Sequence, residues 1–313
     1  FMQIPVGSLV DRFGPQRLLT IMASLCALSC FTFAGTHSLL VAHFSRMLMG
    51  FSGAFAFVGA LKLATMCFDS NKLGLMAGLT QGLGMLGAAG GEGPLSVVVT
   101  WVGWRYTVHL LGMILLVIAF AIFFVTKYSV RDTNEVQHNK VDDHGYGMWS
   151  GLFYIVRSKV TWINALYVGM LFAPTAVFAE LWGVSYIQYT YHISKTMAAN
   201  SISFIFLGWA IGSPLIGALS DSLGKRKPFM LLSALASLVT MLAILYIHVS
   251  YDALLIIMFF YGVSNTGVAI SYAVSGECHP PQVSGISIAF TNMASVIFGA
   301  VMQPIVGGLL DSS

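Results

Sequence analysis

The chain has 313 residues, of which 57% are hydrophobic and only 9% are charged, and its mean hydropathy is +0.82. Soluble domains carry about 25% charged residues, so a soluble fold of this length would lack the polar surface that it needs. This composition excludes a soluble enzyme, a nucleic-acid-binding protein and a disordered protein.

Long apolar runs indicate an all-α, polytopic membrane protein, because a bilayer-spanning helix needs about 20 apolar residues. A membrane β-barrel is a poor alternative, since its strands alternate apolar and polar residues over about 10 positions. Residues 1–10 are expected to be the tail of a further span, and we expect the sequence to be a fragment. The complete spans are predicted at 18–36, 39–66, 74–100, 106–126, 161–188, 197–219, 228–248, 253–275 and 285–309.

The longest polar stretch, residues 127–159, is predicted to be a linker between two helical bundles. If the loop at 11–17 is cytoplasmic, the loops alternate so that eleven basic residues lie inside and only Arg105 and Lys195 lie outside. This asymmetry follows the positive-inside rule and places the linker in the cytoplasm. The inside set is Arg12, Arg17, Lys72, Lys127, Arg131, Lys140, Arg157, Lys159, Lys225, Arg226 and Lys227.

An internal repeat relates the two parts of the chain at an offset of 210 residues. Residues 7–17 (GSLVDRFGPQR) align without gaps to residues 217–227 (GALSDSLGKRK), and the same offset places Pro94 on Pro304. Internal repeats of this kind are typical of transporters. Extending the repeat predicts six helices in each half, with a helix and a half missing at the front and one at the back.

Several motifs resemble the major facilitator superfamily. The loop at 7–17 is similar to its signature loop, and Arg46-Met-Leu-Met-Gly50 is similar to its fourth-helix motif. GLTQGLGMLGAAGGEGP at 78–94 loosely resembles its glycine-rich fifth helix, and Gly-Trp-Arg at 103–105 commonly follows that helix. The resemblance implies two pseudo-symmetric six-helix bundles, here truncated to about ten helices: 1–126, the linker 127–159, and 160–313.

The loop residues are expected to form a conformational gate. Asp11 can cap the positive end of a neighbouring helix or pair with Arg12 or Arg17. Gly7 and Gly14 permit the close approach and the tight turn that such a contact needs. The resemblance implies that this loop stabilises the outward-facing state. The gate residues are Gly7, Asp11, Arg12, Gly14, Arg17, Asp221, Gly224 and Lys225.

Charged residues inside the spans are candidates for substrate binding or proton coupling, because a charge in the membrane usually faces the bundle interior. Arg46 is one, with snorkelling to the outer surface as the alternative. Lys62, near the inner end of the same span, is expected to snorkel. Glu180 is the best candidate for a proton or substrate-ammonium site, with a hydrated outer-rim carboxylate as the alternative. Nearby Trp182 is either a cavity wall or part of the interfacial aromatic belt.

Two further residues are weaker candidates. Glu92 lies among glycines and could pair with Arg46, or it could face a hydrated outer crevice. Asn265 could contact substrate, since the family's tenth helix lines the cavity, or it could hydrogen-bond between helices.

The sequence predicts no catalytic residues, no metal site and no cofactor. The cysteines lack ligand spacing, and no GxxxxGK[ST] nucleotide-binding motif is present. We therefore expect a monomeric secondary transporter in a lipid bilayer, most simply a bacterial inner membrane, that moves a small polar solute with protons as the coupling ion and binds no nucleic acid. The sequence also resembles bacterial organic-anion and sugar-phosphate permeases and relatives of lysosomal dipeptide carriers. An efflux pump of the same fold and a non-transporting sensor or remnant are the alternatives.

Overall fold

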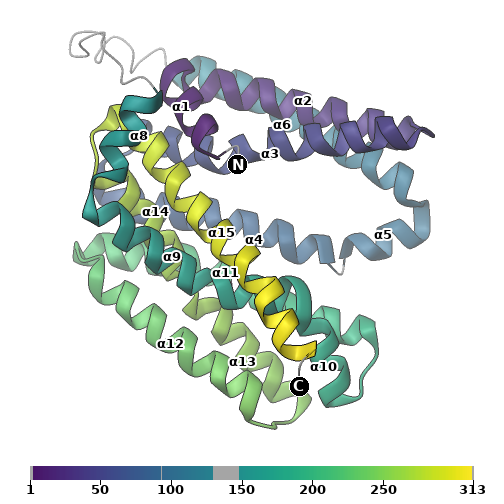
Figure 1. Ribbon diagram of the computed structural model, residues 1–313. Coiled ribbons are helices and arrows are strands. Elements are labelled where there is room, and N and C mark those ends of the chain that lie inside the picture. The colour runs from purple at the N-terminus through teal and green to yellow at the C-terminus, as the bar shows by residue number, and fades with distance from the viewer. Residues whose placement is uncertain (1–2, 93, 130–147, 312–313) are drawn as a thin grey trace. The chain divides into compact units, whose positions relative to one another are not determined.

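The computed structural model describes residues 3–92, 94–129 and 148–311, and within these ranges the chain is helical with no strand (Figure 1). Nine of the described helical segments are long and apolar enough to cross a membrane, and they match the nine predicted spans. The all-α polytopic fold is therefore confirmed.

The chain divides into two compact units that interleave along the sequence. The first unit contains residues 1–66, 97–155 and 279–289, and the second contains residues 67–96, 156–278 and 290–313. Segments from both sequence halves therefore occur in each unit. The predicted halves, 1–126 and 160–313, remain a prediction, and residues 130–147 of the predicted linker lie outside the described residues.

The first unit is built on α2 and α6, which pack along each other (Figure 1). Gly112 on α6 allows this approach, since a Cβ there would lie 2.9 Å from the Phe31 ring of α2. The helices of this unit are α1 (Gln3–Phe13), α2 (Pro15–Gly35), α3 (Leu39–Cys67), most of α5 (Pro94–Val102), α6 (Trp104–Ser129), α8 (Met148–Val156) and η3 (Pro281–Val283), with the first turns of α15 (Ser284–Asp311).

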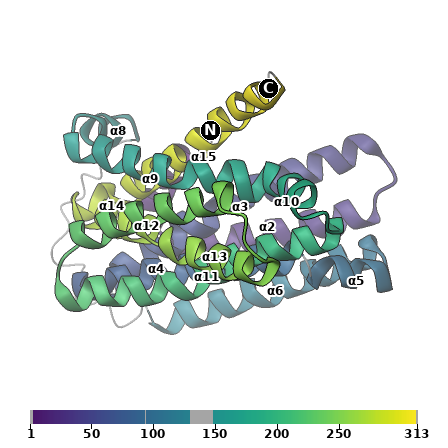
Figure 2. The same cartoon turned by 90° about the horizontal axis from the view of Figure 1, so that it is seen from below.

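In the second unit, α11 is the central helix, with α4 and α13 packed against it (Figure 2). Its elements are η1 (Ser70–Lys72), α4 (Leu73–Glu92), α9 (Lys159–Val177), η2 (Phe178–Trp182), α10 (Gly183–Tyr191), α11 (Lys195–Leu223), α12 (Lys227–Tyr246), α13 (Tyr251–Ser264), α14 (Gly267–Glu277) and most of α15.

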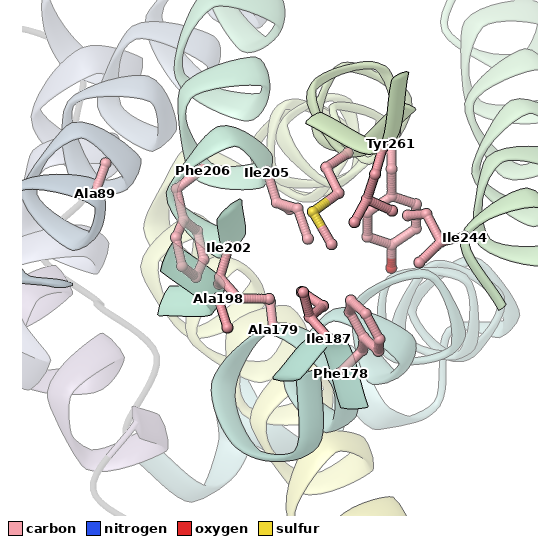
Figure 3. Packing of buried hydrophobic residues seen from close by; sticks show 12 residues of the cluster. Ala89, Phe178, Ala179, Ile187, Ala198, Ile202, Ile205, Phe206, Ile244 and Tyr261 are labelled. Atoms are coloured by element: carbon pink, nitrogen blue, oxygen red, sulfur yellow. The ribbon is translucent and has the colours of Figure 1, made fainter. Parts of the chain in front are cut away.

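The hydrophobic core of the second unit gathers buried side chains from six of these elements (Figure 3). Trp209 and Tyr261 are the largest fully buried side chains of this unit. The core is formed by Ala89, Phe178, Ala179, Ile187, Ala198, Ile202, Ile205, Phe206, Ile244, Leu254, Met258 and Tyr261.

Three predicted spans are not single uninterrupted α-helices. The span at 74–100 ends as α4 at Glu92 and resumes as α5 at Pro94, because Pro94 follows glycines at 90, 91 and 93, which are poor helix formers. The span at 161–188 contains the π-helical turn η2, and the span at 253–275 changes from α13 to α14 at Asn265 and Thr266.

Candidate functional site

The Asp11 carboxylate caps the beginning of α15. Its two oxygens accept backbone N–H groups from Gly285 at 3.1 Å and Ile286 at 3.0 Å. The positive end of a helix dipole favours a carboxylate at this position. Asp11 therefore contacts a helix start that lies 274 residues further along the chain.

Lys62 on α3 neutralises the negative charge of the Asp11 carboxylate. Its ammonium nitrogen lies 2.6 Å from Asp11 Oδ1, and the two side chains are only 7% and 8% exposed. The same ammonium group donates to Ser284 Oγ at 2.8 Å and to the Pro281 carbonyl. Burial raises the pKa of the Asp11 carboxyl, and the charge and hydrogen bond of Lys62 and the two N–H groups oppose that rise.

Glycines let the backbones approach at this cap. A Cβ at Gly7 would lie 2.7 Å from both the Ala289 Cβ and the Gly285 carbonyl oxygen, so no larger residue fits between α1 and α15 without a shift. A Cβ at Gly285 would lie 2.6 Å from Asp11 Oδ1. Gly14 has a φ of 82° before α2, where glycine is the natural residue.

Asp221 makes the equivalent cap in the second half of the chain. It accepts the N–H groups of Gly74 at 3.0 Å and Leu75 at 2.7 Å, at the beginning of α4. Asp221 lies 210 residues after Asp11, and its helix start at Gly74 lies 211 residues before Gly285. The sequence repeat is thus matched by a structural repeat in which each aspartate caps a helix from the other half.

Arg226 neutralises the second cap. Its Nη1 lies 2.6 Å from Asp221 Oδ1, and its Nη2 lies 2.5 Å from Glu277 Oε1, so one guanidinium bridges two carboxylates. Burial acts to lower the pKa of Arg226, but the hydrogen bonds and charges of Glu277 and Asp221 outweigh it and raise that pKa.

Small residues also line the contact between α4 and α11. Gly74, Gly78 and Gly82 are spaced by four along α4, and a Cβ at any of them would meet the α11 backbone. Such small-xxx-small spacing lets membrane helices pack closely. The glycine-rich segment 78–94 includes Gly78 and Gly82, but the four-residue spacing that begins at Gly74 and its contact with α11 were not predicted from the sequence.

Only some of the predicted gate residues take part in the two caps. Asp11 and Asp221 act as caps, and Gly224 ends α11 in the left-handed conformation at a φ of 61°. Arg12, Arg17 and Lys225 are exposed, and the cations that contact the aspartates are Lys62 and Arg226.

The expectation that Lys62 would snorkel is wrong, because its side chain is buried against Asp11. A signal was available in the sequence: a lysine and an aspartate at inner helix ends can neutralise each other. Arg226 is predicted only as one of the inside basic residues, although Asp221, near the end of α11, and Glu277, the last residue of α14, are acidic residues at inner helix ends.

Of the predicted cavity charges, Arg46 belongs to the first unit, and Glu180 and Glu92 belong to the second. Arg46 is exposed on α3, with its guanidinium 5.5 Å from the centroid of the Phe33 ring. Glu180 is exposed on the π-helical turn η2. Glu92 is the last residue of α4, but its side chain lies outside the described residues, so its pairing with Arg46 stays a prediction.

Trp182 and Asn265 carry polar atoms that are buried without a hydrogen-bond partner in the described part of the chain, namely Trp182 Nε1 and Asn265 Oδ1. Asn265 is fully buried and donates through Nδ2 to the Tyr261 carbonyl at 2.9 Å. The Trp182 ring packs at Gly307 on α15, where a Cβ would lie 3.1 Å from Cζ2.

The comparisons with known proteins agree with these features. A model described as Major Facilitator Superfamily matches residues 1–304. The chain belongs to the major facilitator superfamily. Membership of this family indicates a multi-pass integral membrane protein.

Relatives of this superfamily chain carry the names of transporters. The glycine betaine/proline/ectoine/pipecolic acid transporter OusA of Dickeya dadantii (strain 3937) is 23% identical over 74% of this chain and 50% of its own length. The nitrate/nitrite transporter NrtP of Nostoc punctiforme is 29% identical over 41% of this chain and 26% of its own length. The chain spans about half or less of the length of these curated relatives.

A solved structure shares the fold. The crystal structure of the Escherichia coli fucose:proton symporter FucP matches all of this chain and 81% of its own chain, with a TM-score of 0.71 and 13% sequence identity. At this identity the match shows the fold alone.

Proposed function

We propose that the protein is a secondary active transporter that carries a small polar solute across the membrane by alternating access. The observation that carries the proposal is the pair of equivalent caps, Asp11 on α15 and Asp221 on α4, one from each half of an internal repeat. Family membership and the nine apolar helical segments within the described residues support the same function. Repeats that rock about a midplane site are the usual basis of such transport.

The two caps act as gates in this proposal. The halves 1–126 and 160–313, joined by the linker 127–159, rock against each other. When the inner side opens, α1 separates from α15 and α4 separates from α11. Each aspartate then loses its N–H donors, and Lys62 and Arg226 become available to water. Water then solvates the charges that the closed caps neutralise. The conformations with the inner side closed and open are therefore both accessible.

The solute class is a small anion or zwitterion. Arg46 on α3 would attract its negative group, and Glu180 or Glu92 would attract an ammonium group or carry a proton. The names of NrtP and OusA, which specify nitrate, nitrite and small betaine-like or amino acid solutes, support this class. Because Asn265 is fully buried, it would reach a solute only after the surrounding helices move.

Glu180 is the proposed proton-coupling residue. It lies on η2, and π-helical turns inside α-helices occur frequently at functional sites. Trp182, two residues later, would form a wall of the same site. The name of FucP, a fucose:proton symporter, supports proton coupling in this fold. We place the protein as a monomer in a bacterial inner membrane, with the linker in the cytoplasm.

The test is uptake by the purified protein in proteoliposomes. Labelled nitrate, organic acids, sugar phosphates, amino acids, dipeptides and glycine betaine would be offered with and without an inward proton gradient. We expect gradient-stimulated uptake of one class, its loss in Glu180→Gln and a raised KM in Arg46→Gln. The matched control is Asp252→Asn, which removes an exposed carboxylate from the first turn of α13 and should leave uptake unchanged.

Other outcomes would overturn parts of this proposal. Uptake that ignores the gradient and survives Glu180→Gln would make the protein a uniporter or exchanger. Transport only in the outward direction would favour the efflux alternative. A folded protein that moves none of these solutes in either direction would favour a sensor or a remnant.

A further inference from the structure

The short helix α8 (Met148–Val156) has two different faces. Gly151 and Ile155 are buried, and Ile155 packs with Val283 at the end of η3 and Ile286 in the first turn of α15. The opposite side carries Trp149 and Phe153, one helical turn apart, with exposed fractions of 67% and 65%. Tyr154 adds a third aromatic side chain that is 43% exposed.

The chain holds α8 close to the surface of the bilayer. Only two residues, Arg157 and Ser158, separate the end of α8 from Lys159, where the next membrane-spanning segment begins. A connection from Val156 to Lys159 reaches at most about 11 Å, even when fully extended. The buried face of α8 also packs where the span of α15 begins, which fixes the helix at the level of the membrane surface.

The residues on the exposed face of α8 are of the types that are enriched at the membrane surface. Trp and Tyr are enriched where headgroups meet acyl chains, because one part of the ring is apolar and another part is polar. Arg157 continues the stripe of Trp149 and Phe153 at the same four-residue spacing, and Lys159 follows it; both are exposed. Basic residues beside an apolar helix face favour anionic headgroups.

We propose that α8 is an interfacial helix whose aromatic face, Trp149, Phe153 and Tyr154, inserts into the headgroup and acyl boundary of the bilayer. Arg157 and Lys159 contact anionic lipid headgroups beside it. This lipid contact holds the end of the linker against the membrane. It does not depend on which solute the protein transports.

The test places a fluorescent label on this face. The four native cysteines are replaced by serine, and Trp149→Cys or Phe153→Cys is labelled with the environment-sensitive dye NBD. The protein is reconstituted in vesicles of phosphatidylcholine with or without phosphatidylglycerol. Asn71→Cys, which labels an exposed residue of the short helix η1, is the control in water. Ser150→Cys gives a second position on the exposed side of α8.

We expect the NBD emission of the 149 and 153 labels to shift to shorter wavelength than that of the 71 label. Lipids that carry a nitroxide near the headgroup should quench them, and aqueous iodide should not. Phosphatidylglycerol should increase the shift, and Arg157→Gln should reduce that increase. Strong iodide quenching at 149 and 153 would place the face in water. Protection from both quenchers would mean that protein covers it, for example residues 130–147. Either result would overturn the proposal.

Discussion

Asp221 caps the first turn of α4 in the same way that Asp11 caps the first turn of α15. Each carboxylate accepts two consecutive backbone N–H groups, and each is paired with a cation at 2.6 Å. The cations differ in origin, since Lys62 comes from within a membrane-spanning helix and Arg226 from the loop after Asp221 itself. The repeat therefore preserves the cap but not the source of its counter-charge, and the two caps can be tested separately.

Removal of the Asp11 carboxylate should destabilise the protein strongly. Breaking a buried ion pair from one side costs about 3–5 kcal/mol, because the remaining charge is left without compensation. We expect Asp11→Ala to lower the thermal denaturation midpoint in detergent and to leave Lys62 buried and unpaired. The control is Arg12→Ala at an exposed neighbour, where changes usually stay within about 0.5 kcal/mol. Equal effects of the two substitutions would contradict the cap.

The pairing of Lys62 with Asp11 should appear as coupling between two substitutions. Lys62→Met and Asp11→Asn should each destabilise the protein, but the double variant should lose less than the sum. Residues in direct contact typically show coupling of about 0.5–3 kcal/mol. The measurement is a double-mutant cycle on the unfolding free energy. Strict additivity would show that the two groups act independently.

Arg226 should not be replaceable by lysine. Its guanidinium contacts Asp221 and Glu277 through different nitrogens, and a lysine ammonium lacks this planar fork. We expect Arg226→Lys to lower the denaturation midpoint nearly as much as Arg226→Ala. Lys225→Ala, at the exposed adjacent residue, should have little effect. Full rescue by lysine would show that only the charge matters.

The fold should not tolerate a methyl group at position Gly7, whereas it should tolerate one at position Gly50. A Cβ at Gly7 would meet Ala289 and the Gly285 carbonyl oxygen at 2.7 Å, whereas nothing lies within 4 Å of a Cβ at Gly50. Overpacking typically costs about 1–3 kcal/mol. Gly7→Ala should therefore destabilise the protein, while Gly50→Ala should be neutral or stabilising. The two denaturation midpoints, compared in the same detergent, decide the point.

His279 should make stability depend on pH. Burial lowers the pKa of its imidazole in the folded protein, so the unfolded chain binds a proton more readily. The stability contributed by the neutral ring is complete above the unfolded pKa of about 6.5 and is lost as the pH falls below it. We expect His279→Gln to weaken the fall in stability between about pH 7 and pH 5. An identical pH profile in the variant would exclude this residue as a cause.

The sequence was a good guide to the spans because membrane helices carry a strong signal of length and hydropathy. It also gave helix capping as one of two roles for Asp11, beside pairing with Arg12 or Arg17, and Gly7 as a point of close approach. It did not identify the helix that Asp11 caps, since Gly285 lies 274 residues away and no local pattern connects them. The repeat located Asp221 by the same logic, but the predicted gate included Lys225, whereas the cation that contacts Asp221 is Arg226.

Other features of the structure could not be predicted from the sequence, for physical reasons. Lys62 at the end of a span is normally expected to snorkel, and only its packing against Asp11 overrides that preference. The helix α8 was missed because it is short and follows a strongly polar stretch. The roles of Arg46, Glu180, Glu92, Asn265 and Trp182 depend on a bound solute, and side-chain positions alone do not assign them.

The long chain separation of the first cap has a consequence for biosynthesis. Domains are translated at about 5–20 residues per second, so roughly 14–55 s pass between the synthesis of Asp11 and that of Gly285, 274 residues later. Throughout this interval, the aspartate has no N–H donors from α15, but Lys62 is synthesised early in it. The ion pair can therefore hold the charge neutral in the nascent protein until α15 arrives, and a chain without Lys62 should be most vulnerable to quality control before its translation is complete.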